Sequence, residues 1–134
     1  MKKICAFVAI ILAVTFFASC EKDAGKLPNI SFKTGASYIS ADATVKKDTT
    51  ITIGINASKA EDKDVLKTFD ASSIFDGGAS TSFANESLSG SSGDSYSKDL
   101  SIHVRNQAGT EKYTFTVVNK DGLKNSVTVT LTVN

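Results

Sequence analysis

The chain has 134 residues, the length of one domain, and its 15 basic and 14 acidic residues leave a formal net charge of only +1. A nucleic-acid partner is not expected, because no basic run longer than Lys46-Lys47 follows the N-terminal region to neutralise phosphates. The chain has one histidine, two cysteines and no tryptophan.

The N-terminal segment has the pattern of an export signal. Met1-Lys2-Lys3 precedes an apolar run from Ile4 to Ala18, which is shorter than the roughly 20 residues that a transmembrane helix needs. The run closes in Phe17-Ala18-Ser19-Cys20, which resembles the lipobox of bacterial lipoproteins, although Phe17 stands where leucine is usual. The resemblance implies that residues 1–19 are removed and that acyl chains on Cys20 hold the protein on a membrane. Ordinary secretory cleavage beside a chance cysteine is the alternative, and a retained anchor is a third.

The lipoprotein resemblance also implies a location. Glu21-Lys22-Asp23 is similar to the acidic tags that direct some lipoproteins to the surface, so the outer membrane or cell surface of a Gram-negative bacterium is expected. Residues 20–27 form a predicted flexible tether, and a random coil of that length reaches only about 15 Å. The domain is therefore expected close to the membrane. Cys5 would leave with the signal, so no disulfide is expected.

Residues 28–134 predict one all-β domain. Apolar and polar residues alternate strictly over Thr50–Ser58, which predicts a half-buried strand. Three further strong strands are predicted at 100–104, 113–117 and 127–133, and weaker ones at 30–33, 38–41 and 65–69. Turn residues such as Asp121-Gly122 separate them, and no long helical period appears. We therefore expect an antiparallel immunoglobulin-like β-sandwich of about seven strands.

The C-terminal third strengthens this expectation. Gly109–Val117, the turn Asn119-Lys120-Asp121-Gly122 and the alternating run to Val133 resemble the final two strands of immunoglobulin-like domains of the PKD and cadherin-like type. In such sandwiches a tyrosine at the place of Tyr113 often fastens a corner to the backbone. The chain departs from the PKD pattern by lacking tryptophan. Domains of this type are common in bacterial surface proteins.

Candidate contact residues are few. Asp76–Ser97 is rich in Ser and Gly, and it predicts a long loop that is either filler or functional. Tyr96 in that loop and Tyr38 near a weak strand could present an apolar face to a glycan, or each could be a structural plug. Asp48-Thr49-Thr50 resembles an O-glycosylation pattern of some Gram-negative secreted proteins, which makes Thr49 a candidate for modification.

The sequence offers little reactive chemistry. His103 is predicted on the outer face of its strand, and nothing local supplies the acid and the nucleophile of a catalytic triad. Glu61–Asp64 and Asn119 with Asp121 fit no EF-hand spacing and enclose lysines, so solvated turns are the better interpretation. We therefore expect no catalytic residue, no metal and no cofactor, and we predict that the protein is not an enzyme.

The predicted function is that of a membrane-anchored lipoprotein whose sandwich is an interaction module, binding a protein or a glycan through its loops. The alternative is a structural spacer, or an accessory subunit that pairs with a larger surface assembly by an exposed strand edge. A small hydrolase is the third hypothesis.

Overall fold

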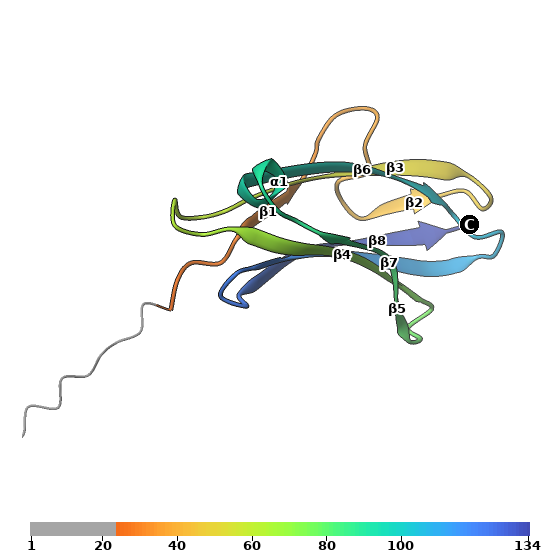
Figure 1. Ribbon diagram of the computed structural model, residues 1–134. Helices are drawn as coiled ribbons and strands as arrows, with labels where there is room; N and C mark the ends of the chain where they lie inside the picture. Colours follow the sequence, from red (N-terminus) through yellow and green to blue (C-terminus); the bar gives the residue numbers. More distant parts are fainter. Residues whose placement is uncertain (1–23) are drawn as a thin grey trace, which may run out of the picture.

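The computed structural model describes residues 24–134. They form two β-sheets that pack face to face (Figure 1). Cys20 and the predicted signal lie outside the described residues. Within the described part, no helix is long and apolar enough to cross a membrane. The elements in chain order are β1 (Asn29–Phe32), β2 (Ala43–Val45), β3 (Thr50–Ser58), β4 (Leu66–Phe75), β5 (Ser80–Ser87), α1 (Ser91–Asp94), β6 (Ser95–His103), β7 (Gly109–Asn119) and β8 (Lys124–Val133).

The fold is an immunoglobulin-like β-sandwich, as predicted. One sheet has three strands in the order β1-β3-β6, and the other has five in the order β2-β8-β7-β4-β5. All strand pairs are antiparallel except β2 with β8, which run parallel. The predicted antiparallel pairing therefore holds except at this one edge, where the three residues of β2 lie parallel to the end of β8.

A single core lies between the sheets and follows the alternation that the sequence showed. In β3, Ile53 and Ile55 are fully buried, as are Phe69 of β4 and Phe115 of β7. Burial of each such side chain contributes about 1.5–3 kcal/mol. The four strands with strong alternation are all present, because the same apolar faces that produce the pattern form this core.

Two of the other predictions were wrong, and the strand predicted at 65–69 was confirmed but is longer than expected. Residues 38–41 form no strand, although Ile39 donates its N–H to the carbonyl oxygen of Thr52 on β3 (2.9 Å). The strand predicted at 65–69 continues to Phe75. The predicted loop 76–97 holds β5, α1 and the start of β6. β5 was not predicted because it is a sheet edge with mostly exposed side chains, so it has no buried face that would require apolar residues at alternate positions.

The chain enters the domain at one end of the sandwich. The Asn125 side-chain amide donates to the carbonyl oxygen of Pro28 (3.0 Å), and that of Asn119 donates to the carbonyl oxygen of Lys26 (3.4 Å). The last residues of the predicted tether therefore already contact the turn between β7 and β8. The last residues of β4 and β6 lie toward the opposite end.

Candidate functional site

One side of the sandwich is open. β5 is the edge of the five-stranded sheet, β6 is an edge of the three-stranded sheet, and α1 connects the two. β5 ends and β6 begins near this short helix, and the two strands diverge toward the other end of the molecule (Figure 1). Exposed strand edges are uncommon unless a protein protects or uses them.

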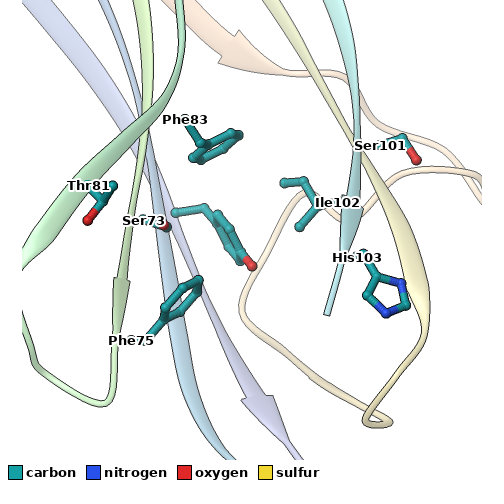
Figure 2. Close-up of a pocket in the computed structure, with 8 residues that line it drawn as sticks. Ser73, Phe75, Thr81, Phe83, Ser101, Ile102 and His103 are labelled. Carbon is teal, nitrogen blue, oxygen red and sulfur yellow. The ribbon is translucent and has the colours of Figure 1, made fainter. Parts of the chain in front are cut away.

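A pocket of about 410 Å³ lies where β5 and β6 diverge. Phe75 and Phe83 lie on one side of it, and Ile102 and His103 lie across from them (Figure 2). This site, hereafter the aromatic pocket, is lined by Ser73, Phe75, Thr81, Phe83, Ser101, Ile102, His103 and Tyr113. Phe75 and Phe83 are 39% and 44% exposed, and Leu27 is the one other large apolar residue exposed in residues 24–134. Gathered exposed apolar side chains mark interaction sites.

A β-bulge gives Phe83 its position. Ala71 pairs with Ala84, but the next residue, Ser72, pairs with Ser82, so Phe83 is an extra residue in β5. Bulges re-aim a side chain and bend the strand that carries them. The sequence does show an aromatic residue, Phe83, within the otherwise polar stretch 80–87. Phe83 was not considered as a contact residue because this stretch was interpreted as a loop.

Phe75 is fixed by a cation. The Arg105 guanidinium lies 4.3 Å from the centre of the Phe75 ring, and it donates to the Asp76 carboxylate (3.0 Å). This contact holds the pKa of Asp76 below its usual range. Asp76 has a left-handed φ of 52°. Its carboxylate lies against Gly109, where only glycine fits, because a Cβ on Gly109 would lie 2.1 Å from an Asp76 carboxylate oxygen.

A buried carboxylate supports the inner wall of the aromatic pocket. Glu111 is fully buried and accepts hydrogen bonds from the Arg105 backbone N–H (3.0 Å), the Arg105 side chain (2.9 Å) and the Tyr113 hydroxyl (2.5 Å). The Tyr113 ring packs edge-on against Phe75 and Phe83, with centroids 6.4 and 5.9 Å apart. Burial raises the pKa of Tyr113, so its hydroxyl stays a donor. Tyr113 thus bonds to a side chain, where the resemblance implied a bond to the backbone.

The narrow end of the open side is closed by Glu86 of β5. Its carboxylate accepts from the Tyr96 hydroxyl (2.8 Å) and the Lys98 amine (2.5 Å), both on β6. Tyr96 is only 8% exposed and packs on Phe69 with ring centroids 5.0 Å apart. Its ring therefore does not present the exposed apolar face on which its prediction as a glycan contact rested. It lies inside β6, in the core.

The Glu86 contacts make one pH dependence testable. The bond from Lys98, and then that from Tyr96, lowers the pKa of Glu86 in the folded protein. A carboxyl group with a lowered folded pKa stabilises above its unfolded pKa, about 4.3 for Glu, and loses this contribution as pH falls through the folded value. Denaturation of the wild type and of Glu86→Gln should differ at pH 7, and the difference should shrink as the pH falls through the lowered pKa of Glu86. Equal stability of the two proteins at pH 7 would contradict the assignment.

Tyr38 lies on the outer face of the three-stranded sheet, away from Tyr96. Its ring lies over Gly54, where an added Cβ would come within 2.7 Å of the ring. Its hydroxyl donates to Asp99 (3.2 Å), and Lys33 pairs with the same carboxylate (2.6 Å), which lowers the pKa of Asp99. Tyr38 is half-buried. The two tyrosines are therefore not brought together, and the contact role of Tyr38 stays a prediction.

His103 has partners that the sequence analysis did not expect. Thr50 pairs with His103 across β3 and β6, which brings its hydroxyl oxygen to 3.3 Å from Nδ1. Asp48, with a left-handed φ of 58°, places a carboxylate oxygen 2.9 Å from Nε2. An acid and a hydroxyl thus both contact the imidazole, on an exposed surface where Asp48 and His103 are more than 60% exposed. Thr49 follows in the same turn, half-buried, and its modification stays a prediction.

The two acidic segments considered for calcium lie in different turns and contact each other through the hydrogen bond between Asn119 and Asp64. Asp64 is 2% exposed and accepts from the Asn119 side chain (2.8 Å) and from the Val65 N–H (2.8 Å). Asn119 in turn accepts from the N–H groups of Asp121 and Leu123. Among residues 24–134 no three His, Cys, Asp or Glu side chains are grouped to hold a metal ion.

No protein-family model and no curated protein matches the chain. Its fold is similar to that of superoxide reductase (neelaredoxin) from Ignicoccus hospitalis, with a TM-score of 0.54 and 8% identity over 81% of each chain. It is also similar to part of an alkylpurine DNA glycosylase from Pseudomonas fluorescens, with a TM-score of 0.51 and 14% identity over 78% of this chain and 30% of that one. A CARDB domain from Pyrococcus furiosus matches with a TM-score of 0.48 and 14% identity, over 80% and 97% of the two chains.

These likenesses correct one prediction. The prediction that the protein is not an enzyme is contradicted, because superoxide reductase, which is an enzyme, has a similar fold. At 8% identity the likeness shows the fold alone. Function has to be argued from the site, since one fold hosts unrelated activities.

Proposed function

We propose that this protein is an exported lipoprotein whose sandwich domain binds a protein or glycan partner at the aromatic pocket. The exposure of Phe75 and Phe83 beside this pocket carries the proposal. A volume of about 410 Å³ lies in the range of ligand pockets, about 300–1,000 Å³. The hydroxyl groups of Ser73, Thr81 and Ser101 add polar contacts at the lining.

The anchor belongs to the same proposal. Acylated Cys20 would hold the protein on the outer membrane or cell surface, with Lys26 and the turn between β7 and β8 at the membrane-facing end. Phe75 and His103 end their strands toward the other end of the sandwich. The aromatic pocket would therefore stay accessible to a partner outside the membrane.

A substitution in the pocket tests the binding role. Phe83→Ser removes an exposed aromatic side chain from an edge strand and should leave the fold intact. Binding to envelope proteins or to a glycan array should fall at least about tenfold, because the partner loses its contact with the Phe83 ring. A tenfold loss of affinity corresponds to about 1.4 kcal/mol of binding free energy. Leu27→Ser is the matched control, because Leu27 is 54% exposed and lies at the other end. Binding that is equally strong in Phe83→Ser and the wild type would contradict the proposal.

A further inference from the structure

We propose that the partner at the aromatic pocket is an extended peptide segment of another protein, which adds as a fourth strand beside β6 and inserts an apolar side chain between Phe83 and Ile102. This inference rests on the proposed function and names the class of its ligand.

β6 offers backbone groups to such a strand. Within residues 24–134, β6 pairs with β3 and with no other strand. Val104 donates its N–H to the carbonyl oxygen of Thr49 (2.8 Å), in register with the pairing of Ile102 with Ile51. In an antiparallel pair, successive residues alternately direct their backbone N–H and C=O groups toward the partner strand and away from it. Because Ile102 and Val104 bond to the chain of β3, Ser101 and His103 direct these groups away from β3. Outward backbone groups on a sheet edge are what an added strand binds.

The opposite sheet provides a floor for the added strand. Phe69 of β4 packs on Tyr96 of β6, so β4 lies across from β6. β5 is one strand further out, and no strand of the three-stranded sheet in the described residues lies opposite it. A strand beside β6 would face β5 at the usual separation of about 10 Å between packed sheets. Phe83, bulged out of β5, would then contact its inward side chains.

The chemistry of the site selects the occupant. The lining of the aromatic pocket contains no Asp, Glu, Lys or Arg, which complements an uncharged apolar side chain. A second copy of this chain fits poorly, because β5 extends one strand beyond β6. Two copies joined through their β6 edges would place each β5 strand where the partner has β4. A single extended segment has no second layer and avoids this collision.

The contacts also limit the sequence and position of the peptide. Glu86 bridges to Tyr96 and Lys98 at the narrow end, so the free edge runs from about Asp99 to His103. Successive side chains of a strand point to opposite faces. The peptide should therefore carry apolar residues at alternate positions, with polar residues between them facing solvent.

The test uses the full protein, purified from membranes in detergent, and a phage-displayed library of random peptides. Selected peptides should alternate apolar and polar residues, and a synthetic copy should slow amide hydrogen exchange at Ser101 and His103. Ser101→Pro removes an outward N–H without removing a bond to β3, and edge strands tolerate proline. It should weaken binding of the synthetic peptide about tenfold or more. Ser101→Ala is the reference for this comparison, because it lacks the same hydroxyl but keeps the N–H, so Ser101→Pro should bind the synthetic peptide about tenfold or more weakly than Ser101→Ala does.

The outcomes separate this inference from the proposed function. Selected peptides that leave exchange at Ser101 and His103 unchanged would overturn strand addition, whatever the stability of Ser101→Pro. A glycan-array signal that requires Phe83, together with a library that yields no binder, would overturn the peptide class and leave the proposed function standing. No ligand of either class that depends on Phe83 would overturn both.

Discussion

Replacing Glu111 with alanine is expected to lower the free energy of unfolding by about 3–5 kcal/mol, because the change removes a buried carboxylate from its ion pair and leaves several donors without their acceptor. Glu111 is fully buried, and the Arg105 side chain is 24% exposed. The substitution deprives three donors of their acceptor: the backbone and side chain of Arg105 and the Tyr113 hydroxyl. Urea denaturation of the purified protein measures the loss.

Two further variants serve as controls for the stability loss of Glu111→Ala. Glu111→Gln preserves the shape and one acceptor oxygen, so its loss should be smaller than that of Glu111→Ala. Lys112 is exposed on the same strand, and Lys112→Ala should stay within about 0.5 kcal/mol of the wild type, as surface substitutions usually do. If Glu111→Ala cost no more than Lys112→Ala, the network would not support the fold.

The Glu111 network also couples stability to the aromatic pocket. Arg105 covers the Phe75 ring while it bonds Glu111, and Tyr113 contacts both phenylalanines of the pocket. Loss of Glu111 should therefore reduce ligand binding as well as stability. Phe83→Ser should reduce binding with little change in unfolding, which distinguishes the supporting residue from the contact residue.

Replacing Cys20 with serine is expected to release the protein from the membrane almost completely. Each buried CH₂ of an acyl chain contributes about 0.8 kcal/mol to membrane binding, and stable anchoring takes two signals. Serine offers no thiol for acylation. Cell fractionation measures the shift from the membrane to the aqueous fraction, and mass spectrometry of the mature N-terminus identifies the lipid.

The second cysteine provides the control for anchoring. Cys5 lies within the predicted signal and would be removed with it, so Cys5→Ser should leave anchoring and the mature mass unchanged. An unmodified Cys20 at the mature N-terminus, or a Cys20→Ser protein that remains in the membrane fraction, would contradict the lipoprotein proposal.

Much of the fold could be predicted from local patterns. β3 spans the residues whose alternation predicted it, because a strand with one buried face has to place an apolar side chain at every second residue. β2 and β5 could not be predicted in this way. Both are sheet edges whose side chains are at most half-buried along most of their length, and hydrogen bonds to β8 and β4 define them as strands.

The candidate site was harder to predict than the fold. Tyr96 was a candidate as an exposed aromatic, yet its placement opposite Phe69 buries it. Phe83 was not a candidate, since only the register shift between β4 and β5 exposes it at the aromatic pocket. His103 acquires Asp48 and Thr50 through the register of β3 with β6 and the backbone of a turn. None of these relations is local in sequence.

The sequence by itself determined the all-β class, the strongest strands and the near-neutral charge, and it predicted export and acylation at Cys20. These properties follow from residue spacing, composition and a short contiguous motif. Only the tertiary structure decided which strand edges stay open and which aromatic side chains meet at the aromatic pocket. They depend on sheet order and strand register, which arise when segments far apart in the chain pack together.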